Sequence, residues 1–270
     1  MSACGALETA LRTRRADGRK LLVPYLTGGF PGWQDAVRAA AAAGADAIEI
    51  GIPFSDPVMD GPVIQEASQR ALDGGATPLT ILDEARTLDV SIPLAVMTYY
   101  NTVHHTGHER FAQQLASAGI AAAIVPDLPL EESGPWCDAA DAAGIETVML
   151  AAPTAPDSRL PRICARARGF VYSVGLLGVT GERSALASTA AALAARLKSI
   201  TDVPVLIGVG VSNAEQAVEA SRVADGVVQG ASVMRRMLEG GDAGADAVGA
   251  YVAEVRAALD AASAAAGTSR

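Results

Sequence analysis

Two carboxylates in the segment 47–61, which reads AIEIGIPFSDPVMDG, have types and spacing suited to acid–base chemistry. Glu49 lies within a short apolar run, and strand alternation directs Ile48 and Ile50 to one face and Glu49 to the other, towards whatever the sheet encloses. Asp60 follows a proline-containing loop. Burial raises a carboxyl pKa towards neutrality, which suits a group that gives and takes protons at pH 7. The pair therefore predicts catalysis, with a buried ion pair as the structural alternative.

The elements that would position these acids are eight short apolar runs, each followed by a turn and an alanine-rich segment of helical length. The predicted strands are Leu21–Leu26, Ala47–Gly51, Pro93–Thr98, Ala121–Pro126, Thr147–Ala151, Phe170–Val174, Val203–Gly208 and Gly226–Gly230. Glycine-containing turns at Ala43–Ala45, Ala118–Ile120 and Ala143–Ile145 precede three of them. Eight consecutive units predict an α/β fold, a (β/α)8 TIM barrel. A doubly wound open sheet is the alternative, because periodicity does not show closure.

The chain reads as one domain over residues 1–270, because no linker interrupts the pattern. The barrel proper is expected over about residues 21–262, with an extra short helix after the eighth strand, from Gly230–Ser232 through Leu238, and a final helix over Gly249–Ala262. Residues 263–270 are expected to form a frayed tail.

Composition narrows the class of function. Half of the 270 residues are hydrophobic, and the formal net charge of −9 argues against a nucleic-acid groove or an anionic membrane surface. A small-molecule substrate is favoured. Three scattered cysteines, Cys4, Cys137 and Cys164, indicate a reducing compartment, so a cytoplasmic location is expected. The apolar run 21–26 is short and contains Pro24, so neither a signal peptide nor a membrane span is expected.

Glycine-bearing loops follow the last three predicted strands. Leu176–Arg183 is long enough to act as a lid, Gly208–Ser212 offers bare backbone amides, and Gly230–Ser232 opens the extra helix. Loop amides and a helix N-terminus at this end of a barrel commonly hold phosphate. The loops predict a phosphate site, and the alternative is that the glycines only make tight turns.

Three histidines, His104, His105 and His108, cluster in what reads as a loop. A structural zinc site needs four ligands, usually including cysteine, and no such set is evident, so no metal is predicted and the histidines are expected to be solvated. Trp33 and Trp136 are expected at helix starts, as packing residues.

Several ordered motifs together resemble the tryptophan synthase α subunit family. They are PYLTGGFP (Pro24–Pro31), AGADAIEIG (Ala43–Gly51), PFSDP (Pro53–Pro57), DGP (Asp60–Pro62), YYN (Tyr99–Asn101), PDLPLEES (Pro126–Ser133) and GVTG (Gly178–Gly181), covering about residues 21–240. The resemblance implies a barrel fold and reversible retro-aldol cleavage of indole-3-glycerol phosphate to indole and glyceraldehyde 3-phosphate, with no cofactor in this chain.

The resemblance also implies roles for individual residues. Glu49 is the implied general acid/base, Asp60 the acceptor of the indole N–H, and Tyr172 a phenol facing the site, with core packing as its alternative. The implied phosphate contacts are Gly181, Gly210, Gly230 and Ala231, mainly through backbone amides. The implied substrate pocket is Tyr25, Met97 and Tyr99 around the indole, with Thr180 in the lid loop, Thr27 in support and Asp127 meeting the lid or a partner.

Two positions depart from the family pattern. Ala231 stands where serine is usual at the start of the extra helix, with Ser232 one position later. The amide is kept and the hydroxyl is lost, which is expected to weaken phosphate binding by about 0.5–1.5 kcal/mol. Gly175 stands where a serine is common, so different lid behaviour is expected.

A partner is implied by the same resemblance. The family's α subunit docks on a β subunit that carries pyridoxal phosphate, in an α2β2 heterotetramer, and indole passes between them. The implied contact residues are Pro53, Asp56, Asn101 and Pro129, with the Pro129–Ser133 segment; a well-packed loop is the alternative reading. Three further interpretations stay open: a stand-alone indole-3-glycerol-phosphate lyase, a subunit that mainly activates its partner, and another phosphate-binding barrel, which the positions of the carboxylates disfavour.

Overall fold

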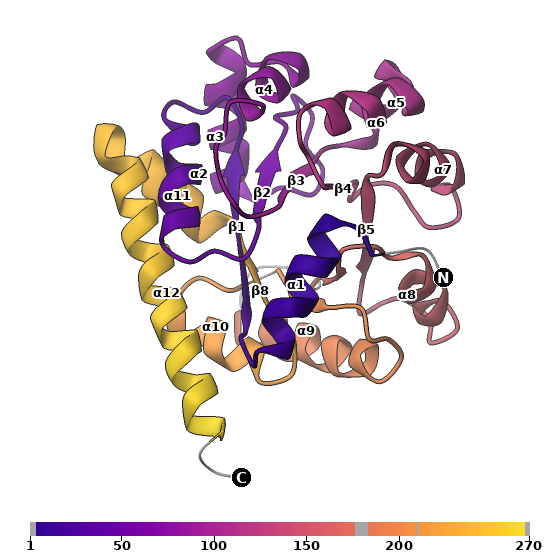
Figure 1. Ribbon diagram of the computed structural model, residues 1–270, viewed down its shortest axis with the longest axis vertical. Helices are drawn as coiled ribbons and strands as arrows, with labels where there is room; N and C mark the ends of the chain where they lie inside the picture. The colour runs from indigo at the N-terminus through magenta and orange to yellow at the C-terminus, as the bar shows by residue number, and fades with distance from the viewer. Residues whose placement is uncertain (1–3, 176–182, 209, 268–270) are drawn as a thin grey trace.

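Eight parallel strands close into a barrel in the computed structural model, which describes residues 4–175, 183–208 and 210–267 (Figure 1). The strands are β1 Leu21–Thr27, β2 Ile48–Gly51, β3 Leu94–Met97, β4 Ala122–Ile124, β5 Glu146–Ala151, β6 Val171–Ser173, β7 Val205–Ile207 and β8 Gly226–Gln229. Each lies within two residues of its predicted bounds. Pairing of Leu21 on β1 with Gly226 on β8 closes the sheet, which confirms the barrel and excludes the open-sheet alternative.

Helices surround the barrel. They are α1 Ala6–Ala16, α2 Trp33–Ala42, α3 Pro62–Asp73, α4 Pro78–Ala85, α5 Tyr100–Thr106, α6 His108–Ser117, α7 Gly134–Ala143, α8 Leu160–Arg166, α9 Arg183–Lys198, α10 Ala214–Ser221, α11 Ala231–Gly240 and α12 Gly244–Gly267, with a 3-10 turn at Gly241–Ala243. The predicted extra helix after the eighth strand is α11. Gly44, Gly119 and Gly144 have φ of 100°, 75° and 74° just before β2, β4 and β5, so glycine does end the preceding helices.

Two expectations about local structure are wrong. The final helix is longer than predicted: α12 runs to Gly267, because alanine, the strongest helix former, dominates the stretch that was expected to fray. The three histidines lie in helices, His104 and His105 in α5 and His108 at the start of α6. The His108 ring lies 3.0 Å from the Tyr100 hydroxyl, so this histidine packs as part of an aromatic cluster.

The core has two parts, as the alternation of strand side chains requires. One fills the barrel and includes Val23, Ala95, Ile124, Val148 and Leu206. The other, larger part lies between the barrel wall and the helices, where Trp33 and Trp136 are both buried. In the described parts of the chain, no helix is long and apolar enough to cross a membrane.

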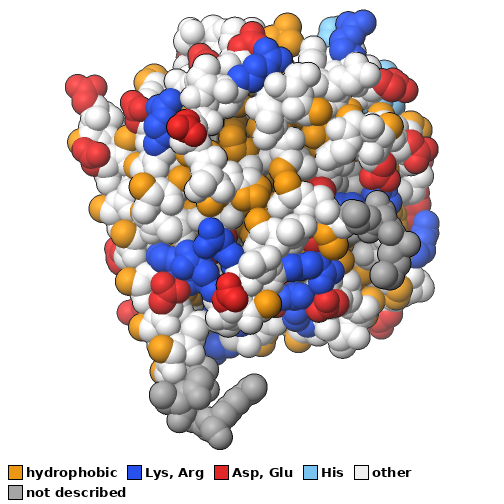
Figure 2. Space-filling view, in the orientation of Figure 1, with side chains coloured by type: hydrophobic (Ala, Val, Ile, Leu, Met, Phe, Trp, Pro, Cys, Tyr) orange, Lys and Arg blue, Asp and Glu red, His pale blue; other side chains and the backbone are white. Residues whose placement is uncertain are grey.

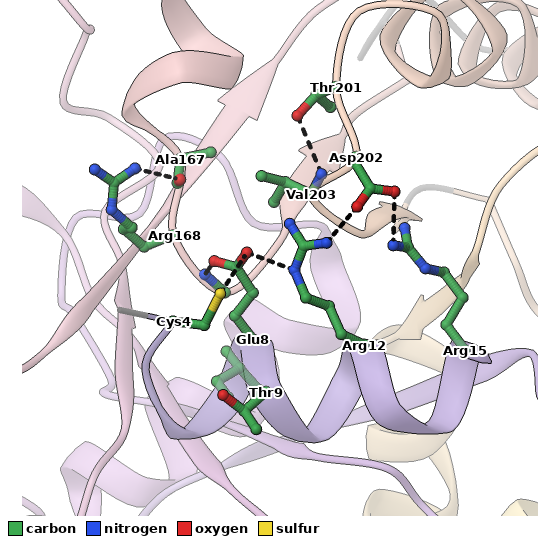
Figure 3. Close-up of polar contacts among 12 residues, drawn as sticks. Cys4, Glu8, Thr9, Arg12, Arg15, Ala167, Arg168, Thr201, Asp202 and Val203 are labelled. Carbon is green, nitrogen blue, oxygen red and sulfur yellow. Dashed lines mark hydrogen bonds and ion pairs between the residues drawn. The ribbon is translucent and has the colours of Figure 1, made fainter. Parts of the chain in front are cut away.

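Helix α1 covers the end of the barrel at which the strands begin, and a network of charged side chains attaches it there (Figure 3). Glu146 at the start of β5 accepts from the first-turn amides of Leu7 and Glu8 at 2.6 and 3.0 Å, so it caps α1 from a distant part of the chain. Arg12 then bridges Glu8 at 2.7 Å and Asp202 at 2.5 Å. On this face, Lys and Arg side chains gather beside acidic ones (Figure 2). The network closes one end and leaves the other available for a site.

Candidate active site

A cavity of about 260 Å³ opens at the end of the barrel where the strands finish. Its walls come from strand ends and from the loops and helices that follow them. The described residues that line it are Tyr25, Glu49, Met59, Asp60, Gly61, Ile64, Met97, Pro126, Leu150, Tyr172, Val174, Gly175, Gly208, Gly210, Gly230 and Ala231. Eight of the residues singled out from the sequence as catalytic, phosphate-binding or pocket residues meet here. They are up to about two hundred positions apart, and they meet because parallel strands all end on one face.

Glu49 lies in the wall of this cavity on β2, only 1% exposed. Its register partners are Tyr25 on β1 and Ala95 on β3, so the three form one row across the sheet. Burial, and next the neighbouring charge of Asp60, raises the pKa of Glu49 to about 8. Its Oε2 atom is buried with no hydrogen-bond partner among the described residues. A carboxyl in this setting is largely protonated at neutral pH and can still ionise.

Asp60 reaches the cavity from the loop between β2 and α3. Burial raises its pKa, and a hydrogen bond with the Tyr99 hydroxyl opposes that rise. The same hydroxyl accepts from the backbone amide of Met59 at 2.9 Å, so Tyr99 holds this loop in place. Pro62 occupies the first turn of α3, which suits its fixed φ and missing amide and ends the loop just beyond Asp60. The two acids thus sit in different surroundings, Glu49 in the barrel wall and Asp60 on a held loop.

Two tyrosines flank the buried acid, each lying across a glycine of a neighbouring strand end. A Cβ on Gly51 would lie 1.9 Å from the Tyr25 hydroxyl, and a Cβ on Gly208 would lie 2.1 Å from the Tyr172 ring. Any side chain at either glycine would displace a phenol from the cavity. Burial raises the pKa of both tyrosines, and the charge of Glu49 adds to the effect, so both phenols stay protonated and can only donate or accept hydrogen bonds.

Next to the tyrosines, two glycines and an alanine line the cavity at the ends of β7 and β8. Gly230 and Ala231 begin α11, and Gly210, with φ of 82°, follows β7. A helix N-terminus next to a glycine turn presents unpaired amides, which suits an anion. Ser232 is buried and lies outside the described cavity wall, so its hydroxyl does not replace the one missing at Ala231. The predicted residues Thr180 and Gly181 lie outside the described residues.

Three of the predicted residues lie away from the described wall of the cavity. Met97 and Tyr25 line that wall, whereas Tyr99, which hydrogen-bonds Asp60, lies outside it. Asp127 also lies outside that wall, and its Oδ1 accepts from the Tyr100 amide at 2.8 Å, which caps the start of α5. Pro53, expected to contact a partner, is buried within this chain. A strand end places a residue near the cavity mouth, but only tertiary packing decides which side of the wall it occupies.

Exposed residues surround the mouth. Asp56, Asn101 and Pro129 are exposed, as a contact surface requires. The loop that carries Asp60 also presents Val58, which is 75% exposed, and Met59, which is 36% exposed. Adjacent exposed apolar side chains beside a cavity indicate an interaction surface, whereas apolar side chains scattered singly over a protein surface do not.

Several lining residues escaped the sequence reasoning. Leu150 and Val174 lie near the ends of β5 and β6, where counting alternate positions along each strand would have found them. Ile64 faces the cavity from the first turn of α3, and Met59 and Pro126 come from loops. For these three the sequence offers no periodic signal.

The fold and the cavity together define a class: (β/α)8-barrel proteins with a buried acid in a cavity at the strand ends, beside glycine turns and a helix N-terminus. The family model described as tryptophan synthase alpha chain matches residues 11–263. The chain belongs to this family, whose role is the cleavage of indole-3-glycerol phosphate by the alpha subunit.

Individual relatives agree. The tryptophan synthase alpha chain of Streptomyces coelicolor is 44% identical over 92% of this chain and 94% of its own length, and that of Thermobifida fusca is 44% identical over 87% and 90%. Among solved structures, a tryptophan synthase from M. tuberculosis in its aminoacrylate- and BRD0059-bound form matches with a TM-score of 0.86 at 32% identity, over 95% of this chain and 99% of that chain. The alpha chain from Legionella pneumophila matches with a TM-score of 0.85 at 30% identity, over 96% and 98%.

Proposed function

We propose that Glu49 and Asp60 carry out the retro-aldol cleavage of indole-3-glycerol phosphate in this chain, with Glu49 as the acid and base. The observation that carries the proposal is a carboxyl 1% exposed in the cavity wall whose Oε2 has no partner among the described residues. This burial raises its pKa to about 8. A group largely protonated at pH 7 can give its proton to indole C3, and the resulting carboxylate can then accept the proton of the adjacent side-chain hydroxyl. Glu49 is therefore protonated again at the end of each turnover.

Asp60 has a different task. Protonation at C3 turns the indole ring into an electron sink and puts positive charge on it, and a nearby carboxylate that accepts the ring N–H stabilises that charge. Burial raises the pKa of Asp60, and the hydrogen bond from the Tyr99 hydroxyl opposes that rise and so favours the carboxylate that this task needs. The carbon–carbon bond then breaks as the hydroxyl loses its proton, which gives indole and glyceraldehyde 3-phosphate. The amides at Gly210, Gly230 and Ala231 are the proposed phosphate donors, and Tyr172 is a proposed hydrogen-bonding group beside Glu49.

The experiment is indole release by the Glu49→Gln variant of the full chain. Removing the proton shuttle while keeping the shape is expected to lower turnover by a factor of about 10²–10⁴ with substrate binding retained. Glu254→Gln, at an exposed position of α12, is the matched control and is expected to release indole at the wild-type rate. Near-normal release by Glu49→Gln would remove Glu49 from its role.

We further propose a β subunit as the partner, in an α2β2 heterotetramer that works in the cytoplasm, with pyridoxal phosphate carried by that subunit. The proposed contact surface is Asp56, Val58, Asn101 and Pro129, which are exposed beside the mouth of the cavity. The matching M. tuberculosis structures are of tryptophan synthase. Exposed apolar Val58 is the proposed anchor, since burial of such a side chain is worth about 1.5–3 kcal/mol.

Two measurements test the partnership. Indole release is measured with and without a tryptophan synthase β subunit from the same source. Strong activation of release by the β subunit supports the partnership, and release that the β subunit does not change means a stand-alone lyase. Only trace release by this chain, together with activation of the β subunit's own reaction, means a mainly allosteric subunit. Val58→Asp is expected to weaken β binding by about tenfold or more. Val223→Asp, an exposed valine before β8 at the other end of the barrel, is the control.

A further inference from the structure

A second cavity, of about 230 Å³, lies behind the barrel wall between β4–β5 and α7–α8. We call it the side pocket. Its wall includes Thr147 and Met149 on β5, Trp136 and Cys137 on α7, and Ile163 on α8. Protein interiors are packed closely enough that voids larger than a water molecule are few, so a space of this size between a barrel and its helices needs an explanation.

The side pocket is a neighbour of the catalytic cavity. Met59, Pro126, Leu150 and Val174 line both. A small molecule formed in the catalytic cavity is therefore released next to the side pocket.

The lining indicates what kind of molecule fits. Most of it is aliphatic, aromatic or sulfur-containing, and apolar cavities of this kind take up small aromatic molecules in preference to water. One oxygen can accept from an occupant: the hydroxyl of Thr147, a residue 2% exposed, has no hydrogen-bond partner among the described residues. A buried hydroxyl without a partner is unfavourable, and it can accept one hydrogen bond. An aromatic ring with one N–H group would fit the apolar lining and would also donate a hydrogen bond to the Thr147 hydroxyl.

Charge argues against an anionic occupant. Arg159 also lines the side pocket, and its Nη2 donates to Glu131 Oε2 at 2.6 Å, so its charge is already paired. Its buried Nε has no hydrogen-bond partner among the described residues and is left as a single N–H donor. A phosphate or carboxylate would have to compete with Glu131 and would face an otherwise apolar wall, which is unfavourable for a buried charge.

We propose that the side pocket binds a free, uncharged aromatic N–H heterocycle of indole size, with the N–H donating to Thr147. The inference rests on the proposed function in one respect: cleavage of indole-3-glycerol phosphate supplies such a molecule next door. The pocket then acts as a store for product beside the site of its formation, separate from the catalytic cavity.

The direct test is a crystal structure of the full chain with 5-bromoindole, read from the anomalous signal of bromine. A bromine peak between β4–β5 and α7–α8 is expected, whether or not a second peak lies next to Glu49. A peak confined to the catalytic cavity, or no peak, would overturn the proposal. This result does not depend on turnover, so a failed Glu49→Gln experiment and an empty side pocket are distinguishable outcomes.

Cys137 gives the test in solution. It is buried in the pocket wall, whereas Cys4 is exposed and Cys164, also buried, lies outside the described wall. Methyl methanethiosulfonate converts a thiol to its methyl disulfide and releases methanesulfinate. This modification of each thiol is followed by peptide mass spectrometry as indole is added. Indole at four times its dissociation constant is expected to slow modification of Cys137 about fivefold, with Cys4 and Cys164 unchanged. Equal rates at Cys137 up to the solubility of indole would mean binding at crystal concentration only, and would overturn the proposal.

Two variants assign the effect to the side pocket. Thr147→Val keeps the shape and removes the hydroxyl, so the indole concentration needed for protection is expected to rise about two- to tenfold. Ala155→Phe fills the pocket from the half-buried loop after β5, a position that tolerates change, and is expected to abolish protection while indole release stays at the wild-type rate. Protection that survives in Ala155→Phe would place the bound indole elsewhere and refute the assignment.

Discussion

Glu49→Gln is expected to make the folded chain more stable, increasingly so as the pH rises. The folded protein holds the pKa of Glu49 at about 8, against an ordinary value of 4.5. Between these values the folded state binds more protons than the unfolded state, so this carboxyl lowers the stability of the fold as pH rises, and its full penalty is present above pH 8. Glutamine has nearly the same shape and no charge to bury.

The magnitude follows from the two pKa values. One pKa unit corresponds to about 1.4 kcal/mol, so the penalty is about 1 kcal/mol at about pH 5.5, about 3 kcal/mol at pH 7 and about 5 kcal/mol at about pH 8.5. The difference between the variant and the wild type also contains a constant contribution from the amide group itself. The change of that difference between the two outer pH values, about 3–4 kcal/mol, does not contain this constant contribution.

The assay is urea unfolding of both proteins across this pH range, with the free energy of unfolding extrapolated to water. Glu254→Gln, on the exposed side of α12, removes a glutamate carboxyl outside the cavity and is the matched control. If the difference in free energy of unfolding between Glu49→Gln and the wild type does not change with pH, Glu49 is not a buried acid with a raised pKa. The acid–base argument then loses its basis.

Three further predictions concern the same molecule. Asp60→Asn removes the like charge beside Glu49 and leaves Glu49 buried, so the pKa of Glu49 should fall while staying above 4.5. The measurement is an infrared titration of the Glu49 carboxyl band, which is identified as the band that Glu49→Gln abolishes. An unchanged midpoint would contradict the coupling between the two acids. Gly208→Ala should destabilise the fold by about 1–3 kcal/mol by displacing the Tyr172 ring, and a double-mutant cycle with Tyr172→Ala should recover most of that loss. Asp46→Asn, at a fully buried carboxyl paired with arginine, should lower the free energy of unfolding by about 3–5 kcal/mol in the same urea assay, and a loss below about 1 kcal/mol would show that the pair is not a structural one.

The strand order and the position of the acids were readable in the sequence because both depend on local patterns. Alternation around Glu49 required that side chain to face away from Ile48 and Ile50, and the strand burial confirms it. Eight repeats of the same local pattern fixed the number of strands. Motifs at matching spacing then indicated the family, which the family model confirms.

Closure, burial and the exact cavity wall were decided by tertiary structure. No local pattern states that Leu21 pairs with Gly226, or that Asp127 turns to cap α5 while Pro126 faces the cavity. The pKa of Glu49 was also decided by tertiary structure, because elements distant in the sequence bury this carboxyl. The side pocket behind β4–β5 also had no sequence signal, since its walls combine residues from strands, helices and loops. Periodicity describes the direction of a side chain from its own backbone, whereas a cavity is defined by atoms that only the fold brings together.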